Sequence, residues 1–325
     1  MTAPREAYGE MLVELGRENP DIVVLDCDLS ASTKTDKFAK VFPERFFNMG
    51  IAEANMMGVA AGLARSGKIP FASTFAVFAS GRAYDQVRQS IAYSGLNVKI
   101  VATHGGLTVG PDGASHQALE DIALMRVLPG MTVIVPADVR ETRAAVRAAV
   151  LHQGPVYIRL GREAVPDVLP EGADFEIGKA RLLHPGIPRE DLFARVDGGP
   201  RFDVAFVACG IMVKACVDAA ETLSREGVRC AVADFASVKP LDEELLEALA
   251  LRSKVVVTAE EHSIIGGLGG AVCEVVSERA PRPVFRVGVR DRFGESGAPE
   301  ELLEAYGLTA SSVARCARQA LMAAR

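Results

Sequence analysis

Short runs of β-branched residues alternate with segments of helical period along most of this 325-residue chain. Such alternation predicts parallel sheets covered on both faces by helices, because parallel neighbours need a long crossover connection. Five runs come first, at 21–26, 69–75, 98–105, 131–137 and 155–161. Four more follow at 203–210, 228–235, 254–261 and 284–289. The sequence therefore predicts an α/β protein with two doubly wound, mainly parallel sheets.

A proline-rich stretch separates the two sets of runs. Residues 166–200 hold five of the 17 prolines and show little periodicity, which is typical of a linker. We expect a first domain at 1–165, a linker at 166–200 and a second domain at 201–325. A chain of this length can bury a core in each domain.

The overall charge limits the class of ligand. A net charge of -6 and a pI near 5.5 argue against a nucleic-acid or anionic-membrane surface. An anionic substrate must therefore meet a local cluster of basic side chains. The six cysteines form no CxxC pair, and no run approaches the roughly 18 apolar residues of a membrane span. We expect reduced thiols and a cytoplasmic location.

One carboxylate stands alone in an apolar segment. Residues 46–64, FFNMGIAEANMMGVAAGLA, contain Glu53 and no basic residue. Glu53 could simply lie in the first turn of a helix that begins near Ile51, stabilised by the helix dipole. Alternatively, apolar surroundings could keep the carboxyl neutral, so that it donates a hydrogen bond or shuttles a proton.

Ligands bind at the carboxyl ends of strands in parallel sheets, so the residues after each run are candidates. The loop at 103–121 holds His104, Asp112 and His116 among glycines that permit close backbone approach to a ligand. These side chains suit contact with a polar ligand better than coordination of a metal. Loop histidines can also lack any functional role.

Two further candidates follow other strands. Phe75 and Phe78 could form a stacking wall for a flat heterocycle, or simply belong to the core. Arg162 follows the run at 155–161 and could bind phosphate or carboxylate, or be a surface residue. The turn at 266–270 is similar to a dinucleotide-binding turn, but Val272 stands where the last Gly is expected, so a closely packed helix start is the better interpretation.

Four segments in order resemble the pyrimidine-binding domain of transketolase, and the chain from about residue 201 resembles its C-terminal domain. The segments are NMGIAEANMMGVAAGLA, FASTFAVF, THGGLTVGPDGASHQALEDIALMRVLPGMTVIVPAD and GPVYIRLGRE. Agreement of several separate signals makes the resemblance specific. It implies a thiamine diphosphate enzyme that transfers a two-carbon ketol unit between sugar phosphates.

The resemblance implies roles for the cofactor-binding residues. Glu53 would hydrogen-bond N1′ of the aminopyrimidine and so activate the cofactor. Phe75 would stack on the pyrimidine, and Phe78 would form a second wall. A third aromatic of the family corresponds to Gly81 here.

Substrate roles follow in the same way. His104 and His116 would approach the reacting ketose or its phosphate as catalytic residues. Asp112 would contact a substrate hydroxyl, and Arg162 would bind phosphate. Arg5 and Ser32 match two further phosphate contacts. Pro111 replaces an acidic residue found in many transketolases, which affects the expected substrate preference.

A complete transketolase also has a domain that holds the diphosphate through Mg²⁺, with a GDG motif followed by an Asn. This sequence contains no such motif. We therefore expect half of an enzyme with no metal ligands of its own. A separate transketolase alpha (N-terminal) subunit would supply the Mg²⁺ and diphosphate site in an α2β2 heterotetramer.

Four alternatives remain at this stage. The same fold serves the E1 beta subunit of 2-oxo acid dehydrogenases, although the loop GGLTVGPDGASHQ and LGRE fit transketolase better. GRAYDQV is similar to deoxyxylulose-phosphate synthases. A non-catalytic assembly subunit would keep the fold without the chemistry, and a dinucleotide-binding protein would use the turn at 266–270.

Overall fold

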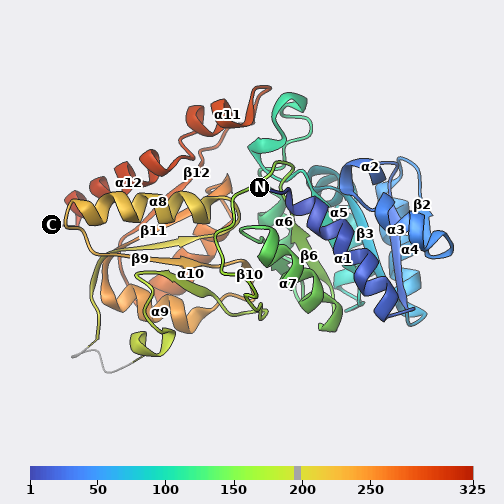
Figure 1. Ribbon diagram of the computed structural model, residues 1–325, viewed down its shortest axis with the longest axis horizontal. Helices are drawn as coiled ribbons and strands as arrows, with labels where there is room; N and C mark the ends of the chain where they lie inside the picture. Colours follow the sequence, from blue (N-terminus) through green and yellow to red (C-terminus); the bar gives the residue numbers. More distant parts are fainter. Residues whose placement is uncertain (194–198, 325) are drawn as a thin grey trace.

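The computed structural model describes residues 1–193 and 199–324. Within these residues the strands form two sheets, and Figure 1 shows the two domains side by side, the first on the right and the second on the left. The prediction of two mainly parallel, doubly wound α/β domains is confirmed. The exact boundaries at 166 and 200 stay a prediction, and residues 194–198 and 325 lie outside the described part.

The first sheet contains all five strands expected in the first half of the chain. Its strands are β1 (Ile22–Asp26), β2 (Phe46–Asn48), β3 (Ile69–Phe75), β4 (Lys99–Thr103), β5 (Thr132–Ile134), β6 (Val156–Arg159) and β10 (Ser237–Lys239). Their order is β10-β5-β6-β4-β3-β1-β2, and β10 pairs antiparallel with β5. The local hydrophobic pattern could not show that β10 belongs to this sheet, because β10 comes from the second half of the chain.

Helices cover both faces of this sheet. They are α1 (Pro4–Glu18), α2 (Ser30–Thr33), α3 (Asp36–Val41), α4 (Glu53–Arg65), α5 (Tyr84–Gln86), α6 (Asp121–Arg126) and α7 (Val139–Leu151). Four further helical segments are η1 (Pro43–Arg45), η2 (Phe78–Arg82), η3 (Val87–Ala92) and η4 (Leu107–Asp112). Helices α1 and α7 pack together in front of the sheet in Figure 1, while α4 packs on β3 and η3 on the other face.

The second sheet has the order β12-β11-β8-β9-β7. Its strands are β7 (Arg181–His184), β8 (Phe202–Ala208), β9 (Cys230–Asp234), β11 (Ser253–Ser263) and β12 (Val284–Val289). The helical elements of this half are η5 (Arg189–Leu192), α8 (Met212–Arg225), α9 (Glu243–Arg252), α10 (Leu268–Arg279), α11 (Pro299–Ala305) and α12 (Ala310–Ala323). Strand β7 lies inside the predicted linker and pairs antiparallel with β9.

Apolar packing joins the two domains. One buried cluster includes Ile100 and Tyr157 of the first sheet together with Val207 and Leu245 of the second domain. Because these side chains are fully buried, separating the domains would expose a large apolar area at a cost of roughly 25 cal/mol per Å². In the described part of the chain, no helix has the length and apolar character needed to cross a membrane.

Candidate active site

The carboxyl ends of β6, β4, β3 and β1 lie along one edge of the first sheet, because these strands are parallel neighbours. The residues that follow them are therefore brought together, as the sequence predicts. Residues 28–35 follow β1, Phe78 follows β3, His104 follows β4 and Arg162 follows β6.

Two aromatic rings and two imidazoles form the centre of this edge. The Phe75 ring stacks on His104 with 3.8 Å between ring centroids and lies 5.9 Å from the nearly parallel Phe78 ring. His116 meets the Phe78 ring edge-on at 5.5 Å. Phe75 is buried, whereas Phe78 is half-buried, so Phe78 offers the more accessible aromatic surface.

Glu53 is the first residue of α4 and is buried, as its apolar neighbours predict. Its own segment contains no basic residue, but a basic residue from elsewhere in the chain lies beside it. Nη1 of Arg82 lies 3.2 Å from each of the two carboxylate oxygens, and the Arg82 guanidinium also lies 4.6 Å from the centre of the Phe78 ring. Arg82 comes from η2, 29 positions later, so the segment around Glu53 could not reveal this ion pair.

Two arginines lie close together at the other end of the site. Arg5 donates from Nε to the Arg162 carbonyl at 3.0 Å and from Nη1 to the Ser32 carbonyl at 2.9 Å. Arg162 Nη1 donates to the Val109 carbonyl and lies 3.7 Å from a carboxylate oxygen of Asp112. Burial and then the Arg162 charge lower the pKa of Arg5. This pair of cations suits a phosphate group.

His104 connects the aromatic and basic parts of the site. Its backbone has a positive φ of 60°, and Nδ1 lies 2.8 Å from the Thr103 hydroxyl. Burial, followed by the positive charges of Arg5 and Arg162 and by His116, lowers the pKa of His104 to about 3. His104 is therefore neutral at physiological pH and can accept or donate one hydrogen bond without carrying charge.

The second domain holds the glycine-rich loop in place. Glu261 accepts a hydrogen bond at 2.7 Å from the backbone N–H of Thr108. A Cβ on Gly106 would lie 2.2 Å from the Glu261 carboxyl carbon, and Gly106 has a φ of 91°. Only glycine fits at this position, because a side chain would meet both a clash and an unfavourable backbone conformation.

Arg159 fixes the same loop from the first sheet. It donates from Nε to Asp121 at 2.9 Å and from Nη2 to the backbone carbonyls of Ala118 (3.2 Å) and Glu261 (2.8 Å). The Tyr157 hydroxyl also donates to Asp121. These residues were not among the candidates predicted from the sequence, although an Arg within an apolar strand run indicates a buried ion pair.

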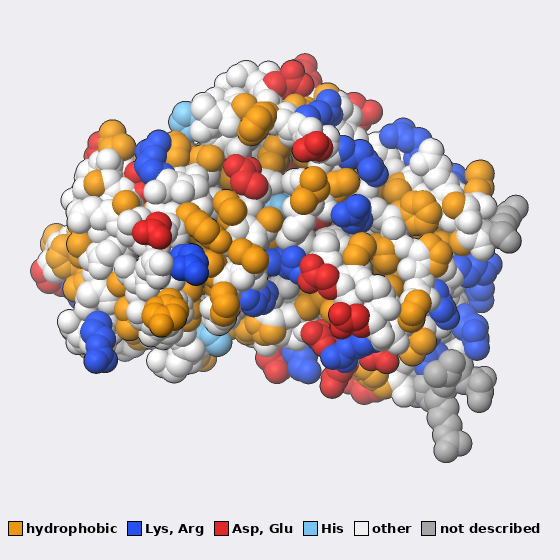
Figure 2. Space-filling model, turned by 180° about the vertical axis from the view of Figure 1, so that it is seen from behind, with side chains coloured by type: hydrophobic (Ala, Val, Ile, Leu, Met, Phe, Trp, Pro, Cys, Tyr) orange, Lys and Arg blue, Asp and Glu red, His pale blue; other side chains and the backbone are white. Residues whose placement is uncertain are grey.

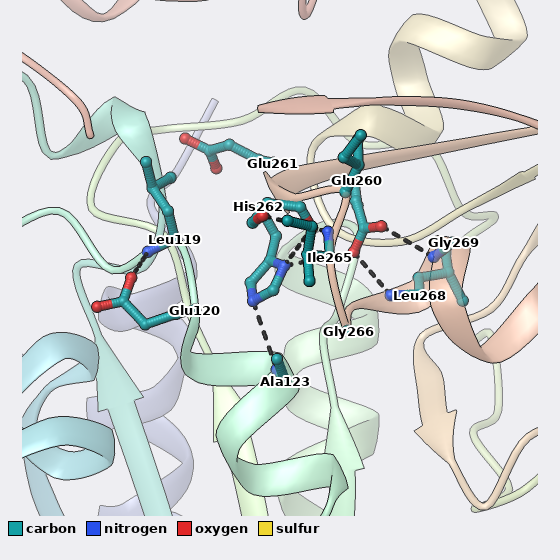
Figure 3. Close-up of polar contacts among 12 residues, drawn as sticks. Leu119, Glu120, Ala123, Glu260, Glu261, His262, Ile265, Gly266, Leu268 and Gly269 are labelled. Carbon is teal, nitrogen blue, oxygen red and sulfur yellow. Dashed lines mark hydrogen bonds and ion pairs between the residues drawn. The ribbon is translucent and has the colours of Figure 1, made fainter. Parts of the chain in front are cut away.

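The turn at 266–270 cannot accept a dinucleotide in this structure. Figure 3 shows that the Glu260 carboxylate accepts hydrogen bonds from the backbone N–H groups of Leu268 (2.7 Å) and Gly269 (2.8 Å) at the start of α10. A Cβ on Gly267 would lie 2.0 Å from Glu260 Oε2. The carboxylate thus occupies the position a phosphate would need, and the interpretation as a closely packed helix start is confirmed.

His262 joins the domains beside this turn. Its Nδ1 lies 2.7 Å from the Ser263 carbonyl, which makes Nδ1 the donor and leaves Nε2 as acceptor. Nε2 receives the backbone N–H of Ala123 in α6 at 3.4 Å, a contact drawn in Figure 3. A fully buried histidine therefore links the second domain to the helix that follows the glycine-rich loop.

Comparison with known proteins identifies the family of this chain. Residues 1–168 match the transketolase pyrimidine-binding domain, and residues 194–313 match the transketolase C-terminal domain. The chain is therefore a member of the transketolase family, and it contains these two domains.

Similar proteins include single subunits of divided transketolases. A Methanocaldococcus jannaschii chain named as a transketolase C-terminal section is 49% identical over 96% of this chain and 94% of its own length. A 6-deoxy-6-sulfo-D-fructose transketolase subunit of a Clostridium species is 44% identical, covering 97% of this chain and 93% of the relative. A solved split-gene transketolase, an inactive beta4 tetramer, is 57% identical with a TM-score of 0.89 and full coverage of both chains.

Replacing Arg159 by Met should strongly destabilise the protein. Asp121 would keep its buried charge without its cation, and we expect the free energy of unfolding to fall by about 3–5 kcal/mol. Arg229→Met is the matched control, because Arg229 is exposed and its partner Asp203 keeps Lys254 as a second cation, so the loss should be less than about 1 kcal/mol. Urea unfolding measures both, and equal losses would contradict a special role for Arg159.

His104 should make the chain less stable in acid. The unfolded histidine gains a proton near its ordinary pKa, whereas the folded one stays neutral until about pH 3, so stability is lost as pH falls below about 6.5. Between pH 7.5 and 5 this should remove about 2 kcal/mol of unfolding free energy. His104→Asn tolerates the same backbone conformation and should lack this component. Identical losses in both proteins would refute the assignment.

Proposed function

We propose that this chain is the beta subunit of a split, thiamine diphosphate-dependent transketolase, which transfers a two-carbon ketol unit between sugar phosphates. One observation carries the proposal. A buried carboxylate (Glu53), an accessible aromatic ring (Phe78), two imidazoles and two arginines lie along a single sheet edge, in a chain that belongs to the transketolase family.

The described residues fit the pyrimidine end of the cofactor. Glu53 receives its hydrogen bonds from one nitrogen of Arg82, so its oxygens retain lone pairs for a ring N–H. Phe78 provides an aromatic surface beside that carboxylate, and we assign Phe75 to the same aromatic wall. When bound, thiamine diphosphate supplies carbanion stabilisation for the transferred unit. Glu53 would accept the pyrimidine N–H and hold it at a fixed position.

Polar residues of the same edge would bind the sugar phosphate. Arg5 and Arg162 would supply positive charge for the phosphate, a role that the neutral His104 cannot fill, and Ser32 of α2 would add a hydroxyl contact. His104 and His116 would instead hydrogen-bond or exchange protons with the ketose hydroxyl and carbonyl groups. Asp112 is exposed, and beside its 3.7 Å contact with Arg162 its carboxylate can accept a hydrogen bond from a substrate hydroxyl.

A partner alpha subunit would complete the site. The described residues include no group of three His, Cys, Asp or Glu side chains able to hold a metal, so we propose that Mg²⁺ and the diphosphate are bound by the partner in a cytoplasmic α2β2 assembly. Figure 2 shows hydrophobic side chains spread over the first domain, on the left. The exposed apolar residues near Glu53 in sequence are Phe47, Ile51 and Val59, with exposed fractions of 38%, 78% and 36%. They offer apolar contacts for the partner.

The alternatives gain less support. The relatives described above are transketolase subunits, which does not favour an E1 beta subunit. A non-catalytic role would not explain the buried ion pair of Glu53 or the strained backbone of His104. Direct assay of pentose phosphates and of other sugar phosphates would identify the substrates.

Glu53→Gln should abolish ketol transfer while leaving assembly intact. The chain would be coexpressed with a partner that carries a GDG motif followed by an Asn, and transfer from xylulose 5-phosphate to ribose 5-phosphate would be measured. We expect kcat to fall about 100-fold or more, because an amide cannot take the place of the carboxylate at the pyrimidine nitrogen.

The matched control is Glu226→Gln, which breaks an exposed pair with Arg318 far along the second domain. It should keep full activity. Full activity of Glu53→Gln in a normally formed complex, or failure of the two wild-type chains to comigrate in size-exclusion chromatography, would reject the proposed function.

A further inference from the structure

A basic cavity lies in the second domain, between the edge strand β12 and helix α12. Its volume is about 290 Å³. The side chains relevant to a ligand are those of Arg290, Arg292, Arg315, Tyr306 and Ser312, and the lining contains no Asp or Glu. In a chain with a net charge of -6, a cavity of this composition is unexpected.

The three arginines have only neutral partners in the described part of the chain. Arg290 Nη2 donates to the Arg286 carbonyl at 3.1 Å, and Arg315 Nη2 donates to the Ser312 hydroxyl at 2.9 Å. Arg292 Nη2 donates to a backbone carbonyl, and its guanidinium lies 3.6 Å from the centre of the Tyr306 ring. Each guanidinium carries five N–H donors, so most of them remain available.

Arg290 and Arg315 line the same cavity as the Cys316 thiol. Burial raises the pKa of this thiol, and the charges of Arg290 and Arg315 partly offset that rise. Both positive charges therefore act on the same small space. Glu295 interacts with the Tyr306 hydroxyl but does not line the cavity. The repulsion between the two cations is thus not relieved by a carboxylate among the lining residues.

The backbone adds further donors. Strand β12 is at the edge of its sheet, so the N–H groups on its outer side have no strand partner within the described residues. Helix α12 has 14 residues and begins at Ala310, close to Ser312, which places the positive end of its dipole at the same cavity.

We propose that this cavity binds a small phosphorylated metabolite, whose phosphate is held between Arg290 and Arg315. Arginine forks match phosphate oxygens, and the volume is near the lower end of small-molecule pockets, which leaves space for little more than the phosphate and a small body. Arg292 and Tyr306 form the wall beside that body. This anion site is separate from Arg5 and Arg162 and does not depend on the proposed transketolase activity.

The test uses inorganic pyrophosphate as the probe, titrated calorimetrically at constant ionic strength. All proteins carry Arg162→Gln, so that the proposed active-site arginines do not mask the second site. We expect saturable binding with a stoichiometry near one per chain. Adding Arg290→Gln and Arg315→Gln should weaken it at least about 10-fold, because two charge-assisted contacts are lost.

The matched control adds Arg279→Gln and Arg318→Gln instead. These arginines lie in the same domain and pair with exposed carboxylates, so the change in net charge is identical. It should leave the affinity within about twofold. No saturable binding in the Arg162→Gln chain, or equal weakening by the two double changes, would overturn the proposal. Binding of polyglutamate without pyrophosphate would also overturn it, in favour of an acidic protein partner.

The variants must be folded for this comparison. Arg290→Lys with Arg315→Lys keeps both charges while removing the forked donors, and we expect it to bind more weakly than the parent but better than the Gln pair. Thermal unfolding checks that each variant is folded. Binding by the Lys pair at parental affinity would indicate point-charge attraction without a shaped phosphate site, and would contradict the proposed geometry.

Discussion

The buried guanidinium of Arg159 is the contact on which the candidate site depends. It neutralises Asp121 at the start of α6 and donates to the carbonyls of Ala118 and Glu261, which belong to different domains. The Glu261 carboxylate in turn holds the loop that carries the predicted substrate residues. A buried charge pair contributes little net stability by itself. Any arrangement in which one partner is missing, however, has a much higher free energy, because the other charge is buried without a counter-ion. The domains and the loop are thus held in one arrangement.

This rigid framework presents a site that is open on one side. Glu53 is buried yet paired with the half-exposed Arg82, and Phe78 is only half-buried. Such preorganised groups suit a site completed by a second polypeptide, since water screens the half-exposed Arg82 cation until the site is covered. The family membership agrees, because similar proteins include subunits of divided transketolases and a beta4 tetramer described as inactive.

The sequence predicted much of this structure because hydrophobic period is a local property. All nine expected strands are present, and Glu53 begins its helix two residues after the expected start. Contacts between distant segments were not predictable in the same way. Arg82 reaches Glu53 from another helix, β10 joins the sheet of the other domain, and Glu261 contacts Thr108 across 153 positions. Each depends on tertiary packing that no short window contains.

The central claim is that the cofactor site is divided between two chains. Equilibrium dialysis of thiamine diphosphate with Mg²⁺ tests it most directly, using this chain alone, the GDG-containing partner alone, and their mixture. We expect weak binding by either chain alone and stoichiometric, tight binding by the mixture, since Glu53 and the aromatic wall supply only the pyrimidine end. Tight stoichiometric binding by this chain alone would disprove a site divided between two chains.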